Sequence, residues 1–415
     1  MNKQTIRSTR KKEPRSTNQR GKQPGLPALV LGILLLLAGV FYGGLWVYGR
    51  SVSLIHVPTE LASSLSPWWA GFKKQVVVQG SIEQAPWYLR LSNRDRSFIE
   101  VRPFNVERKG LITGNSLFPQ KDIQDIYIMD PYVFLVPYQS EGETGLQAIT
   151  NTMVHTINNK SLADWLAKIY SPGPFVILIN GGNDDDFFAF LTVLYSGLSA
   201  DKGDSLPQLF VQAYETKDPT VLGFAQGSTV TFDLTSPFFS SGPGRVLLTA
   251  LADLQDAGYM PSQWQYYTQG DLENQMDIVK ETMVLFGPYS YKKTNYTTRL
   301  LAWRVKLVTD IQGAKPLFPL RLINLSPFGN HILKTDTALF DYMKTKEALR
   351  TLNEKTPFLA ISFDAPLLNR DHRMFLDSII RSTVVPCNIG TEKTSTLRAE
   401  WLSAFRALLK NQAKK

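Results

Sequence analysis

An uncharged apolar segment at residues 26–48 constrains this chain more than any other feature of its sequence. A helix of about 20 apolar residues crosses the hydrocarbon core of a membrane. A cleaved signal peptide usually has a shorter apolar region and a small-x-small cleavage site, and no convincing site follows here. Phe41, Tyr42, Trp46 and Tyr48 are aromatic residues of the kind that lie at a membrane interface. We expect an uncleaved transmembrane signal anchor, with cleavage after the segment as the alternative.

A basic tail precedes this segment. Residues 1–25 contain eight Lys and Arg residues and one acidic residue, Glu13, so most of the net charge of +9 lies there. The positive-inside rule places such a tail in the cytoplasm and the large C-terminal body outside it. Because topology explains the charge, we expect no nucleic-acid partner, although binding of the tail to acidic lipid or nucleic acid is an alternative.

The single cysteine, Cys387, indicates the compartment. It cannot form an internal disulfide, and it lies too close to the C-terminus to be a lipid-attachment site. An exported body without disulfides suits a bacterial envelope better than a small secreted eukaryotic domain. We therefore expect a single-pass protein of the bacterial inner membrane, with its body in the periplasm or outside the cell.

The body alternates between strand and helix patterns, which predicts an α/β architecture. Strands are expected at residues 75–79, 97–101, 126–129, 132–136, 175–179, 229–234 and 283–286, and helices at 161–169, 186–198, 244–254, 335–349, 373–381 and 397–409.

Motifs for catalysis or metal binding are missing from the sequence. The four histidines are scattered, and there is no phosphate-binding loop, dinucleotide-binding motif or nucleophile elbow. The acidic run Asp184–Asp186 indicates a helix start, where carboxylates meet backbone amides, or alternatively a ligand or metal site. We expect no enzyme, no cofactor and no metal.

Several aromatic residues stand near turns or at amphipathic positions: Trp87, Trp264, Tyr289, Tyr291 and Trp401. Flat aromatic faces can stack on the apolar faces of sugar rings. For each residue taken alone, packing in the core is the more common role.

The order of these segments from about Gln75 resembles the family 1 extracellular solute-binding proteins of ABC importers, in their maltose-binding branch. The stretches that carry the resemblance are Leu135-Val-Pro-Tyr-Gln, Lys160-Ser-Leu-Ala-Asp-Trp-Leu, Leu251-Ala-Asp-Leu-Gln-Asp-Ala-Gly-Tyr-Met-Pro, Lys280-Glu-Thr-Met-Val-Leu-Phe-Gly-Pro-Tyr-Ser-Tyr, residues 335–357, and Trp401-Leu-Ser-Ala-Phe-Arg-Ala.

The resemblance implies a type II periplasmic-binding-protein-like fold, with two lobes that close on a ligand like a hinge. The boundaries we expect are a tail at 1–25, an anchor at 26–48, a stalk at 49–71, an N-terminal lobe at 72–137 plus 287–334, and a C-terminal lobe at 138–286 plus 335–412. The N-terminal lobe is shorter than the family's. The implied function is to bind a sugar or oligosaccharide for delivery to an ABC permease.

The resemblance also suggests a ligand-binding site. Glu83 matches the family's acidic acceptor of sugar hydroxyls, and Asp185 matches an acidic position in the C-terminal lobe. Phe187, Tyr289 and Trp401 match aromatic positions that line the cleft. The alternative function is a degenerate binding scaffold that acts as an envelope interaction or sensor protein, because the first lobe is short and the anchor is permanent.

Overall fold

The structure is a computed structural model of the 415-residue chain. It describes residues 26–80, 98–103, 112–113, 117, 126–137, 176–198, 206–256, 258–279, 283–292, 303–307, 317–328, 334–362, 365–366, 370–387 and 392–412.

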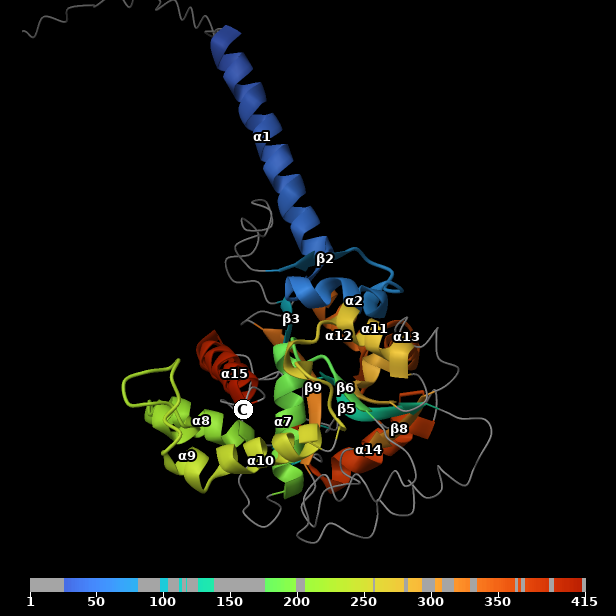
Figure 1. The fold of residues 1–415 in the computed structure, drawn as a ribbon. Coiled ribbons are helices and arrows are strands. Elements are labelled where there is room, and N and C mark those ends of the chain that lie inside the picture. The colour runs from blue at the N-terminus through green and yellow to red at the C-terminus, as the bar shows by residue number, and fades with distance from the viewer. Residues whose placement is uncertain are drawn as a thin grey trace, which may run out of the picture.

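The apolar segment forms one long helix, α1 (Leu26–Ser51), which projects away from the rest of the molecule (Figure 1). Within it, Leu29–Tyr48 has a mean hydropathy of 2.3 and none of it is buried. Among the described residues this is one helix that is long and apolar enough to cross a membrane. The expected apolar helix at 26–48 is therefore confirmed.

The segment expected to be a stalk is instead part of the folded body. Strand β1 (Ser53–His56) pairs in parallel with both β2 (Val76–Gln79) and β3 (Phe98–Pro103). Helix α2 (Thr59–Trp69) buries Trp68 completely, and the Trp68 indole donates a hydrogen bond to the Met343 carbonyl over 3.3 Å. The prediction of a stalk at 49–71 is wrong because these contacts come from residues far away in the sequence.

The strands form one curled sheet that extends through the whole body (Figure 1). Its order is β2-β1-β3-β9-β5-β7-β6, where the strands not yet given are β9 (Leu317–Phe328), β5 (Ile126–Pro137), β7 (Met283–Pro288) and β6 (Val176–Ile179). The shorter strands β4 (Ile112–Thr113), β8 (Trp303–Leu307), β10 (Leu359–Ala360) and β11 (Thr383–Pro386) pair off this path.

Strand β5 changes partners in its middle. Up to Pro131 it pairs with β9, where Asp130 lies opposite Arg321. From Tyr132 onward it pairs with β7, where Tyr132 lies opposite Pro288, and with β8. Proline has no backbone N–H to donate to a ladder, so Pro131 is tolerated where one set of pairings gives way to the next.

Two hydrophobic cores lie along this sheet. The first core gathers β6, β7, residues from both halves of β5 and the start of β9 with five helices: α7 (Asp184–Leu198), α8 (Leu206–Thr216), α10 (Pro243–Asp256), α14 (Arg370–Arg381) and α15 (Glu392–Gln412). The second core gathers β1, β3 and the first half of β5 with α2, α12 (Lys334–Met343) and α13 (Lys346–Lys355). We call the elements around each core a lobe, so the chain is a two-lobed α/β protein, as expected.

The remaining helices α9 (Pro237–Ser240) and α11 (Gln269–Val279) contribute to the first core through Phe238 and Leu272. Packing divides the chain differently from the expected boundaries. Helices α12 and α13 were expected in the lobe formed by 138–286 and 335–412, but Leu339 and Leu349 pack in the second core with α2. A helix pattern predicts an apolar face and does not say which sheet face that stripe will cover.

Most of the expected strands and helices are confirmed, and the helix expected at 161–169 lies outside the described residues. The strand expected at 229–234 is wrong, since only an isolated bridge joins Phe224 to Phe232. There the Ser228 hydroxyl accepts hydrogen bonds from the amides of Val230 and Thr231, and the Asp233 carboxylate accepts one from Thr235. Side chains that bind nearby backbone groups in this way compete with a strand ladder.

The packing of α2 predicts that Trp68→Ala destabilises the chain by about 3–5 kcal/mol, because a fully buried tryptophan leaves a large cavity. Urea unfolding monitored by circular dichroism measures the change. Ser63→Ala, at an exposed position of the same helix, is the matched control. Equal stability of the two variants would mean that α2 does not pack against the body.

Candidate functional site

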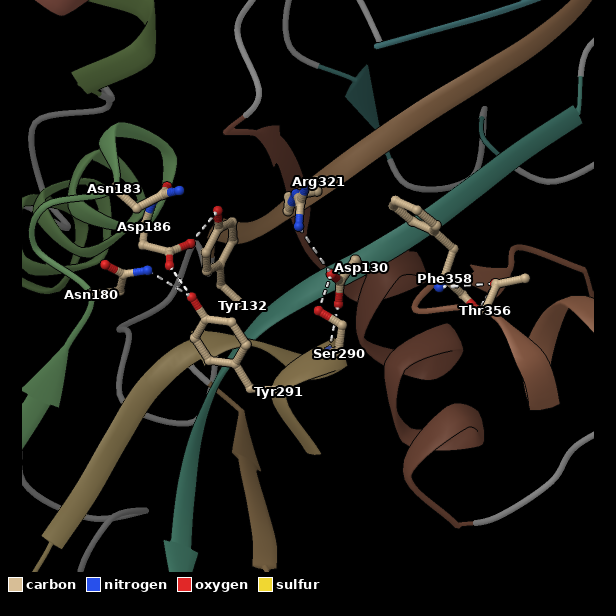
Figure 2. Close-up of polar contacts among 10 residues, drawn as sticks. All are labelled: Asp130, Tyr132, Asn180, Asn183, Asp186, Ser290, Tyr291, Arg321, Thr356 and Phe358. Carbon is tan, nitrogen blue, oxygen red and sulfur yellow. Dashed lines mark hydrogen bonds and ion pairs between the residues drawn. The ribbon is translucent and has the colours of Figure 1, made fainter. Parts of the chain in front are cut away.

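Polar side chains gather where β5 changes its pairing partner from β9 to β7 (Figure 2). We call this group the crossing cluster. Its members come from β5, β6, α7, β9 and the 3₁₀ turn η6 (Tyr289–Lys292), and they are Asp130, Tyr132, Asn180, Asp186, Ser290, Tyr291 and Arg321.

Asp186 links three elements in this cluster. It lies in the first turn of α7, and its carboxylate accepts a hydrogen bond from the Tyr132 hydroxyl of β5 over 3.1 Å. The Tyr291 hydroxyl of η6 donates to its other oxygen. The Asn180 side-chain amide in turn donates to the Tyr291 oxygen over 3.3 Å. A single buried carboxylate therefore ties α7 to the crossing strand and to the turn after β7.

The turn that leads into α7 holds this carboxylate in place. The Asn183 side chain accepts hydrogen bonds from the amides of Asp185 and Asp186, at 3.0 and 3.1 Å, and so caps the helix. A Cβ at Gly181 would lie 2.3 Å from the Trp264 carbonyl oxygen, so only glycine fits this close backbone contact. The Gly182 amide donates to the Tyr267 carbonyl over 2.8 Å.

Burial dominates the ionisation of Asp186. Desolvation raises the pKa of Asp186 to about 7, against the lowering effect of the Tyr291 hydrogen bond and of Arg321. Burial, with the nearby Asp186 carboxylate, also raises the pKa of Tyr132 well above its ordinary value. The Tyr132 phenol therefore stays protonated at neutral pH and remains a hydrogen-bond donor to Asp186.

Asp130 is the second buried carboxylate of the cluster, and it is completely buried. It accepts hydrogen bonds from the Ser290 amide over 2.9 Å and from the Ser290 hydroxyl over 2.7 Å. The Arg321 guanidinium lies 3.6 Å away on the neighbouring strand β9. These contacts join η6 of the first lobe to β5 and β9 at the crossing, next to Pro131.

The expected ligand residue Asp185 lies half-exposed beside this cluster. Its carboxylate pairs with the Arg398 guanidinium of α15 at 2.8 Å, and Asp184 pairs with Arg406 at 2.7 Å. The acidic run thus starts a helix, as one of the two alternatives predicted, although Asn183 supplies the side-chain cap. Among the residues that the structure describes, no group of three or more His, Cys, Asp or Glu could hold a metal ion.

Phe187 and Trp401 lie in the first core and are fully buried. The Trp401 indole donates to the Leu222 carbonyl over 3.0 Å, and its ring stacks on Phe405 at a centroid distance of 4.7 Å. The Phe187 ring contacts Trp264 at 5.4 Å. These partners give both residues the packing role that is common for buried aromatics, and neither presents a face to solvent.

Tyr289 is also almost entirely buried. Its ring meets the edge of Phe375 at 4.9 Å, and its hydroxyl donates to the Asp371 carboxylate over 3.4 Å. Lys292 pairs with the same carboxylate at 2.6 Å. Tyr289 therefore connects η6 to α14. Glu83, the remaining expected ligand residue, lies outside the described residues.

The sequence had singled out Asp186 and Tyr291 but not their partners. Tyr132 and Asp130 stand within an apolar strand pattern, where Asp130-Pro-Tyr interrupts the run. The signal available in the sequence was an acidic residue next to a proline in the middle of an apolar run. Arg321 and Asn180 come from segments far apart in sequence, and only the fold brings them together.

Comparison with known proteins finds similarity only among solved structures. No protein-family model and no curated protein matches the chain. RafE from Streptococcus pneumoniae, in its apo form, gives a TM-score of 0.49 with 9% identity over 87% of this chain and 98% of that one. A sugar transporter from Bacillus licheniformis, in complex with stachyose, gives 0.47 with 9% identity over 87% and 97%.

A family 1 extracellular solute-binding protein from Bifidobacterium longum subsp. infantis gives a TM-score of 0.47 with 10% identity, over 87% of this chain and 94% of that one. The similar structures are thus proteins of solute binding and sugar transport, at about one identical residue in ten. For this chain, function is argued below from its own residues.

The crossing cluster predicts a specific dependence of stability on pH. Because the pKa of Asp186 is about 7 in the fold and 3.8 as its ordinary value, the folded chain holds a proton that the unfolded chain has released. The stability contributed by Asp186 is fully present below pH 3.8 and is lost as the pH rises through 7. Asp186→Asn should remove this loss, so its stability relative to the native chain should rise with pH, by up to about 1.4 kcal/mol per unit.

Urea unfolding at several pH values between about 4.5 and 8, a range that includes the pKa of Asp186, checks this prediction. Asp256→Asn, exposed at the end of α10, is the control and should track the native chain. Parallel pH profiles for native chain and Asp186→Asn would contradict the burial of this carboxylate.

Proposed function

We propose that the chain is a membrane-anchored, extracytoplasmic solute-binding protein that takes a sugar or oligosaccharide between its two lobes and delivers it to an ABC permease. The observation that carries the proposal is strand β5, which is shared by both cores and changes partner at Pro131. Two lobes joined through such a strand can change their relative angle by small rotations at the crossing. Such a hinge would suit the closing of two lobes around a bound ligand.

Half-exposed polar groups beside the crossing supply suitable contacts for a sugar. Asn180, Asp185, Tyr291 and Arg321 offer an amide, a carboxylate, a phenol and a guanidinium. Sugar hydroxyls both donate and accept hydrogen bonds, so they can pair with each of these groups. This set replaces Phe187 and Trp401, whose burial in the first core leaves them no part in our proposal.

The maltose-binding branch of family 1 remains our proposal for the origin of the fold. We propose that the N-terminal lobe is shortened less than the sequence suggests, because the expected boundary at residue 72 left out β1 and α2. With residues 53–69 counted in the second core, that lobe regains a strand and a helix.

The proposed topology follows from α1 and the charge around it. The basic tail at 1–25 would stay in the cytoplasm, α1 would cross the bacterial inner membrane, and the body would lie in the periplasm or outside the cell. Such an anchor keeps the body at the membrane where a permease partner resides.

A second candidate function is a binding scaffold that has lost its ligand and serves as an envelope interaction or sensor protein. One observation favours it: the candidate polar groups already have protein partners. Asp185 pairs with Arg398, Asp186 binds two tyrosines, and Tyr291 receives a hydrogen bond from Asn180. A ligand would have to compete with these contacts.

Solute binding predicts ligand-dependent stability. A sugar at one hundred times its dissociation constant should stabilise the chain by about 2.7 kcal/mol. A thermal-shift screen of mono- and oligosaccharides against the full chain in detergent measures this. Asp185→Asn should weaken the affinity for the best sugar by about tenfold or more, since a hydrogen bond to a charged group is lost.

Glu215→Gln, an exposed change on α8, is the control and should bind like the native chain. Because Asp185 also pairs with Arg398, the variants are compared by the shift in melting temperature that the sugar causes, and not by the melting temperature itself. If the folded chain shows no shift in melting temperature with any sugar, the proposal of sugar binding is rejected and the scaffold function is favoured.

The anchor predicts that the full chain stays in the membrane pellet after alkaline carbonate extraction, whereas a variant that lacks residues 26–48 is released. In intact spheroplasts of a bacterial host, added protease should digest the body and spare the tail. A body protected from protease would contradict the proposed topology.

A further inference from the structure

The helix α1 enters the body with almost no linker. It ends at Ser51, and β1 begins at Ser53, so Val52 alone separates them. Val52 is 1% exposed and Ser53 is fully buried. A flexible tether would need exposed residues between the anchor and the fold, and this junction has none. The direction of the helix axis therefore sets the orientation of the body.

Gln75 fixes the end of the helix a second time. Its carbonyl accepts a hydrogen bond from the Ser53 amide over 3.0 Å, and its side-chain oxygen accepts one from the Tyr48 hydroxyl over 2.8 Å. Tyr48 is the last residue of the apolar span. An aromatic residue at that position lies at the level of the lipid headgroups. Gln75 is therefore held at the same level.

Two exposed lysines directly precede Gln75. Lys73 and Lys74 both point into solvent, and residues 61–80 contain no acidic residue. Phe72 packs against Tyr342 at a centroid distance of 5.5 Å, and its amide donates to the Trp69 carbonyl over 3.0 Å, so the turn is held to α2 and α12. In Figure 1, β2 and α2 lie on the side of the body from which α1 emerges.

Distance and charge then suggest a partner. Lys74 and Lys73 are one and two residues from Gln75, and each residue spans at most about 3.6 Å. The Cα atoms of both lysines therefore lie within about 8 Å of the Gln75 Cα, a distance similar to the screening length of about 8 Å at physiological salt. A basic residue this close to an anionic bilayer gains about 1 kcal/mol.

We propose that Lys73 and Lys74, held beside the end of α1 by Gln75, seat the β2 edge of the body on an anionic lipid surface. The inference rests on the membrane anchor of the proposed function and not on sugar binding. It adds that the body is held against the bilayer in one orientation, with the second lobe near the lipid and the first lobe away from it. Exposed Val78 on β2 belongs to the same edge.

Spin labelling of the full chain in nanodiscs tests the seating. A nitroxide at Val78→Cys reports on the edge, one at Phe41→Cys on the anchor, and one at Glu215→Cys on α8 in the first lobe. Cys387 is buried and stays in place. Collision rates with oxygen and with a water-soluble nickel chelate are measured in phosphatidylcholine alone and in a mixture with phosphatidylglycerol.

We expect the label at 78 to be shielded from the chelate in the anionic mixture and the label at 215 to be exposed in both lipids. Lys73→Gln with Lys74→Gln should reduce the ratio of seated to free body by about 25-fold, at about fivefold for each lysine. The matched control is Lys217→Gln with Lys410→Gln, which removes the same charge from α8's end and α15 and should change nothing.

Equal chelate exposure at 78 and 215 in both lipids, with the label at 41 in the bilayer, would overturn the seating and leave the anchor standing. Shielding at 78 that survives the loss of both lysines would also overturn the seating, because the charge of these lysines would then play no part in it. A label at 41 exposed to the chelate would instead reject the anchor in the proposed function.

Discussion

Strand β5 carries a constraint on which the rest of the structure depends, because it must serve two cores at once. Ile126 and Ile128 pack in the second core, whereas Tyr127, Met129 and the second half of the strand pack in the first core. The strand pairs with β9 up to Pro131 and with β7 and β8 from Tyr132 onward. At the change of partner, Pro131 supplies no ladder donor, and the carboxylate of Asp130 binds the Ser290 amide and hydroxyl instead. The buried acid thus adds side-chain hydrogen bonds at the point where the strand changes its pairing partner.

The neighbouring carboxylate, Asp186, shows what such an arrangement costs. Two tyrosine hydroxyls donate to it, which suits the ionised form, yet burial favours the neutral form. The hydrogen bonds partly offset the desolvation, and the balance places the pKa of Asp186 at about 7, so that both its protonated and its ionised forms are populated near neutral pH. A polar network of this kind can hold a crossing in one geometry, and it can also be rearranged by a ligand that offers better partners.

The sequence could predict the layered α/β class and most elements, because their periodic apolar patterns are local. It also predicted α1 within a few residues, because a run of about 20 uncharged apolar residues is typical of one long apolar helix. The strand β1 could not be found this way. Its four residues show no alternation, since all are buried, and its partners lie in β2, β3 and, through the Leu54 amide, at Asp336.

The site was predicted less well than the fold for a related reason. The acidic run at Asp184 was visible as a helix start, but the sequence could not say that Arg398 and Arg406 of α15 would pair with it. Nor could it separate a tryptophan that packs from one that stacks on a ligand. Trp401 satisfies its indole N–H on the Leu222 carbonyl, and that partner is set by tertiary structure alone.

The position of β1 has a consequence for the order of assembly. In the proposed topology this strand leaves the membrane first, yet its amide at Leu54 binds Asp336, 282 residues later in the chain. The second core therefore cannot close until most of the body has been synthesised. Much of the first core comes from a continuous stretch of chain, from Ile177 to Tyr289, and its contacts are more local. The lobe nearest α1 is thus completed late, and in the proposed topology its apolar strand must wait beside the bilayer in the meantime.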